Sequence, residues 1–229
     1  MTQQPSLAVI IPCYNEAAAI AKVVQDFRAA LPAARILVFD NNSTDDTVEL
    51  ARAAGAEVFR APIQGKGNVI RQAFAALDAD LYVLVDGDAT YDAAAAPRLV
   101  EALLSGGLDM VIAARRANAN AAYRPGHRLG NRLLTGLING LFGGRIDDLL
   151  SGYRVFSRRF VKSFPALATG FETETELTVH ALALRMPIAE IATDYGARPD
   201  GSHSKLSTWR AGTEFHDSIN YKLHHSTLG

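Results

Sequence analysis

Short apolar runs alternate with stretches of helical periodicity along most of the chain, and this alternation predicts an α/β fold. Short runs bounded by turn residues are typical of strands buried on both faces of a parallel sheet. We expect such strands at residues 7–12, 35–39, 57–60, 81–85 and 109–113. Helices are expected between them, at residues 17–31, 68–77 and 93–104. The order of these elements predicts a Rossmann-like, mostly parallel sheet flanked by helices.

Carboxylates follow two of these strands directly. Asp86 and Asp88, separated by one glycine, follow the run 81–85, and Asp40 follows the run 35–39. Open α/β sheets bind ligands at the edge where the carboxyl ends of their strands meet. Two carboxylates one residue apart are suited to hold a divalent cation that carries phosphate oxygens. An acidic turn without a ligand is the alternative, because Asp and Gly are ordinary turn residues.

The last part of the chain predicts further elements in a less regular order. We expect a helix at 127–142, a strand at 155–156, a helix that opens at 170–176 and reaches 185, a strand at 188–193 and a polar loop at 195–205. The helix at 127–142 has a broad apolar face, and Arg128 and Arg132 lie one turn apart. It is either a core helix with solvated arginines or a helix that rests on an acidic, lipid-like surface. The segment from Arg124 to Phe142 is therefore the candidate for peripheral membrane contact.

Composition excludes several classes of protein. The chain has 229 residues, of which 48% are hydrophobic and 21% charged, as in an ordinary globular domain. Its net charge of −1 gives no global basic field that would attract nucleic acid. Cys13 is the single cysteine, which excludes an internal disulfide framework. No run of apolar residues reaches the ~18 that a membrane span needs. We therefore expect a soluble, cytoplasmic protein.

Four sequence elements together resemble a known family. They are Pro12-Cys-Tyr-Asn-Glu16, the polar cluster at Asp40, Gly65-Lys-Gly67 and Asp86-Gly-Asp88. In combination they closely resemble the family 2 glycosyltransferases of the GT-A fold, in particular the polyprenyl-phosphate sugar synthases of the dolichol-phosphate mannose synthase group. The resemblance extends through 148–154, 170–176 and 198–205 and covers roughly residues 6–210. The lysine motif is not a P-loop, because the upstream glycine and the following Ser or Thr are absent.

The resemblance implies a donor site for a UDP- or GDP-sugar. Asp86 and Asp88 would hold Mg²⁺ or Mn²⁺ across the diphosphate, whose charge grows as it leaves. The implied nucleotide contacts are Pro12, Tyr14, Glu16, Asp40, Asn42 and Lys66. Arg115 would lie near the donor sugar, and Arg198 and Lys205 in a loop that closes over the phosphates, where Arg suits bidentate contacts. Asp88, Arg115 and Arg198 are therefore expected to take part in catalysis.

The acceptor implied by the resemblance is a polyprenyl phosphate, such as dolichyl or undecaprenyl phosphate. A hydroxyl acceptor needs a carboxylate to remove its proton, whereas a phosphate arrives already ionised and needs none. Asp148 matches the acidic residue of the family's D-x-x-[ST]-G-[YF]-R element. It is the candidate for either a general base or a contact on the acceptor side.

Other charged residues remain open to two interpretations. Glu172, Glu174 and Glu176 share one face if the chain is extended there and diverge if it is helical, and one of them is expected at the site. Arg124, Arg128 and Arg132 either meet an acceptor phosphate or are solvated. Arg154, which follows Ser-Gly-Tyr, is either part of the site or structural.

Residues 1–210 are expected to form one glycosyltransferase domain. Residues 211–229 lose apolar periodicity and end in a His-rich sequence, so we interpret them as an atypical tail left by truncation or by an added sequence. The expected place of action is the cytoplasm or the inner face of the membrane.

The sequence thus predicts a metal-dependent, inverting hexosyltransferase that acts on a polyprenyl phosphate. A family member that acts on a hydroxyl of a glycan or small molecule is the alternative within the same class. A sugar nucleotidyltransferase is a poorer match, because it would need a phosphate loop rich in Gly and Arg near the N-terminus. A non-catalytic nucleotide-sugar binding protein is the alternative from another class.

Overall fold

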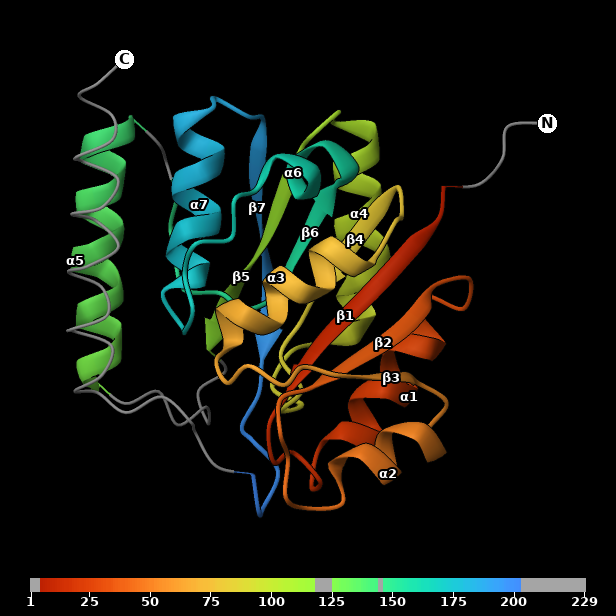
Figure 1. Ribbon diagram of the computed structural model, residues 1–229. Helices are drawn as coiled ribbons and strands as arrows, with labels where there is room; N and C mark the ends of the chain where they lie inside the picture. The colour runs from red at the N-terminus through yellow and green to blue at the C-terminus, as the bar shows by residue number, and fades with distance from the viewer. Residues whose placement is uncertain (1–4, 118–124, 144–145, 203–229) are drawn as a thin grey trace.

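The fold is an α/β sandwich built on one seven-stranded sheet (Figure 1). The computed structural model describes residues 5–117, 125–143 and 146–202, and the side chains of all of these except 117 and 125–132. The strands are β1 Leu7–Cys13, β2 Arg35–Asp40, β3 Glu57–Arg60, β4 Leu81–Leu84, β5 Met110–Ala117, β6 Arg154–Ser157 and β7 Ile188–Tyr195. The helices are α1 Ile20–Ala30, α2 Thr47–Ala53, α3 Lys66–Ala76, the short 3₁₀ helix η1 Ala93–Ala95, α4 Ala96–Ser105, α5 Pro125–Phe142, α6 Arg158–Ser163 and α7 Thr173–Ala183.

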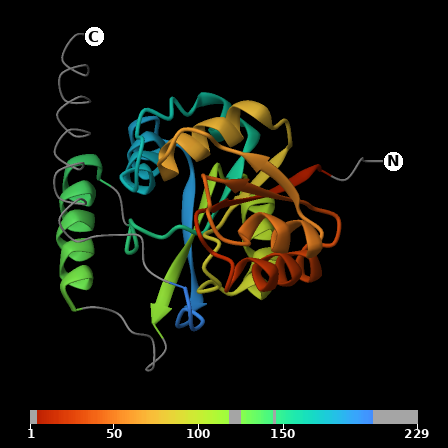
Figure 2. The ribbon, with the colours of Figure 1, turned by 60° about the horizontal axis from the view of Figure 1, so that its bottom comes forward.

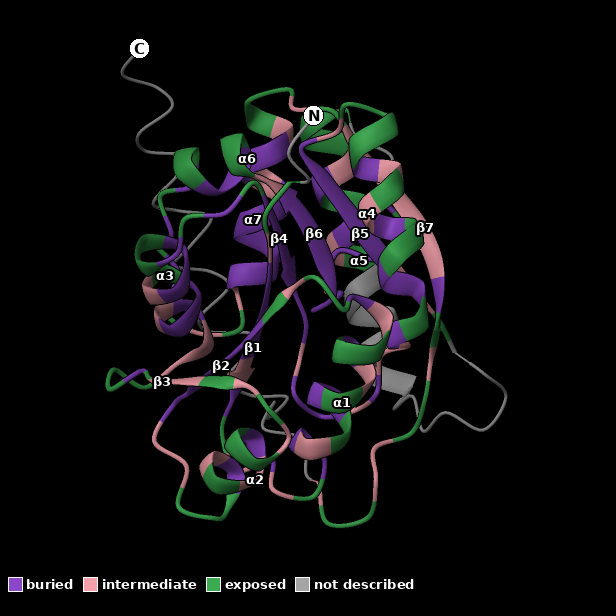
Figure 3. Ribbon diagram, turned by 90° about the vertical axis from the view of Figure 1, so that its right-hand side faces the viewer, coloured by how far each residue is buried: buried purple, intermediate pink, exposed green. Residues whose placement is uncertain are grey.

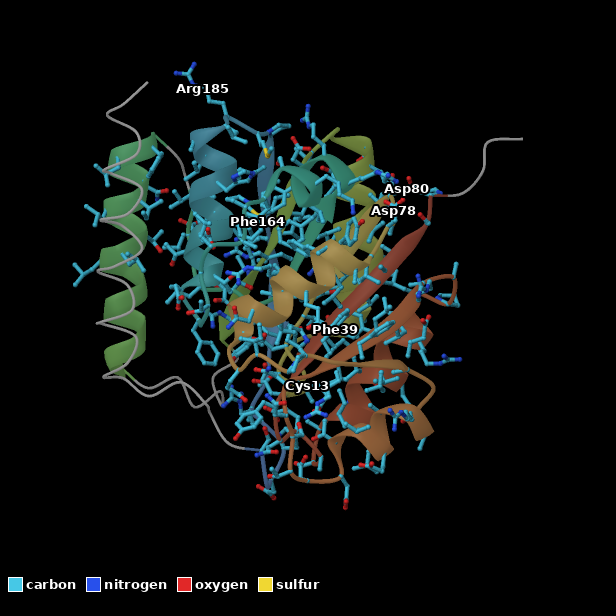
Figure 4. The ribbon with its side chains drawn as sticks, viewed as in Figure 1. Cys13, Phe39, Asp78, Asp80, Phe164 and Arg185 are labelled. Atoms are coloured by element: carbon cyan, nitrogen blue, oxygen red, sulfur yellow. The ribbon has the colours of Figure 1, made fainter. Side chains whose placement is uncertain are left out.

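The first four strands run parallel, as their apolar composition predicted. The sheet order is β3-β2-β1-β4-β6-β5-β7, and β1 pairs with both β2 and β4. The register between β1 and β2 places Cys13 beside Asp40. The carboxyl ends of β1, β2 and β4 therefore lie at one edge of the sheet. Figure 4 shows Cys13 and Phe39 near that edge, and Asp78 and Asp80, which precede β4, near the opposite one.

β6 runs antiparallel to both of its neighbours, which the sequence pattern did not indicate. Arg154 pairs with Leu84 of β4, and Phe156 pairs with Met110 of β5. The loop before β6 lies at the carboxyl end of β5, because the backbone amide and the side chain of Arg115 both donate to Asp148. β6 therefore starts at the edge where β5 ends and runs back across the sheet. The sheet is mostly parallel, as expected, with one reversed strand in its interior, between β4 and β5.

Helices cover both faces of the sheet. The core on one face contains buried apolar residues of α1, α2, η1 and α4, and the core on the other contains those of α3, α6 and α7. Figure 3 shows the buried strands between helices whose outer faces are exposed. Four apolar residues of α1 at the spacing i, i+3, i+4 and i+7, which is typical of one helix face, are all buried: Ile20, Val23, Val24 and Phe27. Helical periodicity therefore predicted the packing face of α1 correctly.

α5 stands at the margin of the molecule and packs against α7, not against the sheet (Figures 1 and 2). Ile138 of α5 is buried, whereas Leu133, Leu137 and Leu141 are 67%, 50% and 60% exposed. The helix is thus apolar on its outer side as well, which a core helix would not be. Among the described residues, none of the helices combines the length and the apolar character that crossing a bilayer requires. Contact of residues 124–142 with a lipid surface stays a prediction.

Candidate active site at the carboxyl edge of the sheet

The Asp86-Gly87-Asp88 turn follows β4 and packs closely against Cys13 and Gly152. A Cβ added to Gly87 would lie 2.6 Å from Cys13 Sγ, and one added to Gly152 would lie 2.3 Å from Asp86 Oδ2. Real Cβ atoms do not approach other heavy atoms so closely, so a side chain at either position would force the Cys13 thiol or the Asp86 carboxylate to move. Gly152 of the loop before β6 therefore forms a wall against which the Asp86 carboxylate lies.

Asp86 forms an ion pair with the lysine of the Gly65-Lys-Gly67 motif. Lys66 Nζ lies 2.5 Å from Asp86 Oδ1 and also contacts Glu174 Oε1. The side chains of Lys66 and Glu174 are buried, and that of Asp86 is 30% exposed. Burial lowers the pKa of Lys66, but Asp86 and Glu174 outweigh this effect and raise the pKa above its ordinary value. Lys66 is therefore a fixed positive charge beside the Asp86 carboxylate, which follows β4.

Asp88 is held by an arginine from the loop after β7. Arg198 Nε donates to Asp88 Oδ2 over 2.8 Å, and Nη2 of the same guanidinium lies 2.6 Å from that oxygen. Asp88 Oδ1 accepts hydrogen bonds from the amide and the hydroxyl of Thr90. Burial opposes the charge of Arg198, but the Asp88 carboxylate raises the pKa of the guanidinium. The Arg198 loop therefore reaches the Asp-Gly-Asp turn, and its predicted contact with phosphates stays a prediction.

The end of β2 supplies Asp40, Asn41 and Asn42. Asp40 is buried, and its Oδ1 accepts a hydrogen bond from Ser43 N over 3.2 Å. Asn41, which the sequence analysis did not select, donates to the carbonyls of Ala61 and Ile63 and accepts from Gly65 N. Asn41 thus fixes the loop that leads to Lys66.

Asn42 has a left-handed backbone, with φ of 66°, and its side-chain amide donates to Pro62 O and Gln64 Oε1. This side chain therefore holds the same loop, and its predicted contact with the nucleotide stays a prediction.

The loop after β1 joins the β2 end to the loop after β7. Glu16 is buried, and its Oε2 accepts a hydrogen bond from Ser202 Oγ over 2.8 Å. Tyr14 is 38% exposed and Pro12 is half-buried. The structure thus brings Pro12, Tyr14 and Glu16 to the same edge as Asp40 and Asp88. Their predicted roles toward a nucleotide stay predictions.

Arg115 and Asp148 form a bidentate pair beside the Asp-Gly-Asp turn. Arg115 Nε lies 2.7 Å from Asp148 Oδ2, and Nη2 lies 2.7 Å from Oδ1. Glu190 of β7 accepts hydrogen bonds from the amides of Asp147 and Asp148 over 2.6 and 3.0 Å. Burial raises the pKa of Glu190, although these amides oppose the shift. A single Glu inside the apolar strand IAEIAT was the available signal for this residue, and the sequence analysis missed it.

Of the three alternating glutamates, Glu174 is the one that reaches the Asp86–Lys66 pair. They lie at the start of α7, so their side chains diverge, as expected for a helix. Glu176 accepts hydrogen bonds from the amides of Leu167 and Ala168, and Glu172 accepts from those of Thr169 and Gly170. These two hold the loop that precedes their own helix.

Arg154 is structural in its contacts. It is fully buried and donates to the carbonyls of Leu149 and Ser151 and to Thr178 Oγ1. Its hydrogen bonds to Leu149 and Ser151 therefore fix the loop between Asp148 and Gly152. Lys205 and Arg124 lie outside the described residues, as do the side chains of Arg128 and Arg132.

Asp86 and Asp88 fit a divalent cation bound together with phosphate oxygens. Mg²⁺ is usually held by one or two carboxylates together with substrate phosphates. In the part of the chain that the structure describes, no third His, Cys or carboxylate completes an all-protein metal site. A side chain at position 152 would occupy the space next to Asp86 Oδ2, and glycine leaves that space open. This donor set suits a cation whose remaining ligands come from a nucleoside diphosphate and water.

Mn²⁺ affinity is expected to fall as the pH drops below about 6. Burial, opposed by Lys66 and reinforced by Asp88 and Glu174, raises the pKa of Asp86 to about 6. A protonated carboxyl does not ligate the metal, so affinity should decline by up to about tenfold for each pH unit below that value. Electron paramagnetic resonance of free Mn²⁺ between about pH 5 and 8 measures the affinity. Circular dichroism over the same range controls for unfolding, and a constant affinity down to pH 5 would contradict the expectation.

Comparison with known proteins finds similarity to glycosyltransferases. The family described as "Glycosyl transferase family 2" matches residues 8–164. Protein RfbJ of Shigella flexneri is 54% identical over 124 residues, which are 54% of this chain and 96% of RfbJ. Glycosyltransferase AglJ of Haloferax volcanii is 36% identical over 93% of this chain and 70% of its own length.

The name of a third relative and the contents of one solved structure include specific ligands of those proteins. A dolichyl-phosphate hexose transferase of Haloferax volcanii is 28% identical over 93% of this chain and 92% of its own length. Glucosyl-3-phosphoglycerate synthase of Mycobacterium tuberculosis, solved with Mn²⁺, UDP and glucosyl-3-phosphoglycerate, superposes with a TM-score of 0.77. It is 25% identical in sequence, and the match covers 99% of this chain and 81% of the synthase.

Proposed function

The chain belongs to glycosyl transferase family 2 and is a glycosyltransferase, and we propose that it moves a hexose from a UDP- or GDP-sugar to a polyprenyl phosphate. The observation that carries the acceptor proposal is the Arg115–Asp148 pair. Both carboxylate oxygens of Asp148 accept from the guanidinium of Arg115. A carboxylate held in this way is a poor proton acceptor, and a phosphate acceptor needs none.

Two of the comparisons support this proposal. One relative is a dolichyl-phosphate hexose transferase, whose acceptor is a lipid phosphate by its name. The mycobacterial synthase was solved with Mn²⁺, UDP-glucose and phosphoglyceric acid, so a phosphate-bearing molecule also occurs in that complex. A UDP-sugar is accordingly our first choice of donor for testing.

Under this proposal, the residues on the two sides of the Asp-Gly-Asp turn have different roles. On the donor side, Glu16 and Asp40 would bind the nucleoside, and Lys66 and Arg198 would offset the charge of the diphosphate. A cation held by Asp86 and Asp88 would supply Lewis-acid stabilisation of the leaving group. On the other side, Arg115 and Asp148 would lie near the donor sugar, where the acceptor phosphate would arrive. An oxygen of that phosphate would attack the anomeric carbon, the bond to the nucleoside diphosphate would break, and the configuration would invert.

A direct transfer assay tests the proposal. The purified chain is incubated with Mn²⁺, undecaprenyl or dolichyl phosphate, and labelled UDP-glucose, UDP-galactose or GDP-mannose. Transfer of label to the organic phase, dependent on the lipid phosphate, is the expected result. Transfer only to hydroxyl acceptors would replace the acceptor by a glycan or small molecule. Donor binding without turnover on any acceptor would indicate a nucleotide-sugar binding protein.

Asp148→Asn is expected to keep kcat within about tenfold of the wild-type value if the acceptor is a phosphate. The amide oxygen still accepts one hydrogen bond from Arg115, so the main effect should be a higher KM for the acceptor. A loss of ~10²-fold or more in kcat would instead point to general-base catalysis on a hydroxyl. Steady-state kinetics with a varied lipid phosphate measure both constants.

Arg115→Gln is the matched control for this variant, because it breaks the same pair from the other side. If the two variants lose kcat equally, the loss reflects the geometry of the pair. If only Asp148→Asn loses kcat, the carboxylate itself is required and the phosphate acceptor is contradicted.

A further inference from the structure

Both carboxylates of the Asp-Gly-Asp turn are bound by basic side chains, but the two pairs differ in one respect. Lys66 contacts Asp86 and also Glu174, so it keeps a buried carboxylate partner if it leaves Asp86. Arg198 is different: among the described residues, Asp88 is the only carboxylate within ion-pairing distance of it. If Arg198 leaves Asp88, its charge must find another anion.

The loop that carries Arg198 is attached at both ends to the donor side of the site. Gly196 N donates to Thr90 O over 2.8 Å, and Ser202 Oγ donates to Glu16 Oε2 over 2.8 Å. Tyr195 forms a β-bridge with Tyr91, and their rings are in edge contact at 5.1 Å. Arg198 lies between these attachments. Its side chain, 31% exposed, can therefore turn away from Asp88 while the loop stays in place.

We propose that Arg198 couples metal binding to diphosphate binding, because it competes with the cation for Asp88 and finds its alternative partner in a diphosphate oxygen. The proposal rests on the proposed function, since it takes Asp88 as a metal ligand and a nucleoside diphosphate as the donor's leaving group. A metal ion alone must displace a guanidinium that has no second carboxylate. A metal ion that arrives with a diphosphate offers that guanidinium a bidentate partner at the same moment.

Removing Arg198 should change two affinities in opposite directions, whereas the loss of a phosphate contact alone would only weaken nucleotide binding. Removing Arg198 removes the competitor for Asp88, so Mn²⁺ alone should bind more tightly than to the wild type. The same change removes a contact with the diphosphate, so UDP in the presence of Mn²⁺ should bind more weakly. By thermodynamic linkage, the nucleotide raises the affinity for the metal by the same factor by which the metal raises the affinity for the nucleotide. Such factors are commonly ~5- to 150-fold.

The experiment compares Arg198→Met with Arg98→Met in the full chain. Arg98 is an arginine whose guanidinium donates to the carbonyl of Ala192, and its replacement removes the same charge elsewhere on the molecule. Binding of Mn²⁺ alone is followed by electron paramagnetic resonance of the free ion. Binding of UDP, and separately of GDP, is followed calorimetrically with and without Mn²⁺, with a correction for the Mn²⁺–nucleotide complex in solution.

For Arg198→Met we expect Mn²⁺ alone to bind about tenfold more tightly and UDP with Mn²⁺ about tenfold more weakly. Arg98→Met should leave both affinities within about twofold of the wild type. Arg198→Lys, which keeps the charge but loses the fork, should show a smaller change in both affinities, and it serves as the second variant if Arg198→Met does not fold.

Two outcomes would overturn the inference alone: unchanged or weaker binding of Mn²⁺ to Arg198→Met, or unchanged binding of UDP with Mn²⁺. In either case the wild type still binds the nucleotide, so the proposed function stands. If the wild type binds neither UDP nor GDP with Mn²⁺, the proposed function fails and the inference fails with it.

Discussion

Asp88→Asn is expected to lower the rate of sugar transfer by about 10³-fold or more, with the fold intact. The variant keeps an oxygen for the hydrogen bonds from Thr90 but loses the charge that a metal ligand needs. Metal-assisted stabilisation of a leaving group contributes several kcal/mol, and about 4 kcal/mol corresponds to a factor of 10³. Transfer measured with saturating donor and Mn²⁺ tests the expectation.

Asp92→Asn is the matched control for Asp88→Asn. Asp92 lies four positions further along the chain, where its side chain caps η1 by accepting a hydrogen bond from Ala94 N. This control should cost at most about 1 kcal/mol of stability and leave kcat near the wild-type value. Thermal unfolding shows whether either variant is destabilised. Wild-type turnover by Asp88→Asn at saturating Mn²⁺ would remove Asp88 from the metal site.

Gly152→Ala is expected to reduce transfer by about 10²-fold or more through its effect on Asp86. The new methyl would lie 2.3, 2.7 and 2.9 Å from the three atoms of the Asp86 carboxylate, so the carboxylate must move. A displacement of about 1 Å in a positioning group can cost a factor of 10². Because the carboxylate is the nearest obstacle, Mn²⁺ affinity should fall together with kcat.

Gly136→Ala provides the control for an added methyl group. Gly136 lies in α5, and a Cβ added there meets nothing within 4 Å. Alanine is the better helix former by about 1 kcal/mol, so this variant should unfold at a slightly higher temperature and transfer at the wild-type rate. Normal Mn²⁺ affinity in Gly152→Ala would contradict the role of Gly152 as a wall for Asp86.

The sequence pattern predicted the parallel half of the sheet because each strand there is a short apolar run. It also predicted that Asp40 and the Asp-Gly-Asp turn share an edge, since parallel strands end on the same side. The reversal of β6 could not be predicted in this way. Arg154–Ser157 is buried like a parallel strand, and its direction follows from where the preceding loop meets Arg115, a contact between distant residues.

The charged pairs of the site were predictable only in part. Lys66, Asp86, Asp88 and Arg198 were selected as site residues, but nothing in their spacing says which cation binds which carboxylate. Glu174 was one of three equivalent candidates until α7 separated their directions. Asn41 and Glu190 were missed because both act on backbone amides and carbonyls, and such contacts leave no side-chain pattern in the sequence.

The interior position of β6, next to β4, has a consequence for the synthesis of the chain. β4 pairs on one side with β1 and on the other with β6, whose residues follow about 70 positions later. At about 5–20 residues per second, a ribosome needs on the order of ten seconds to supply them. During that time the apolar strand that carries the aspartates has an open edge, which is a template for pairing with other chains. A fragment that ends before β6 would therefore tend to aggregate.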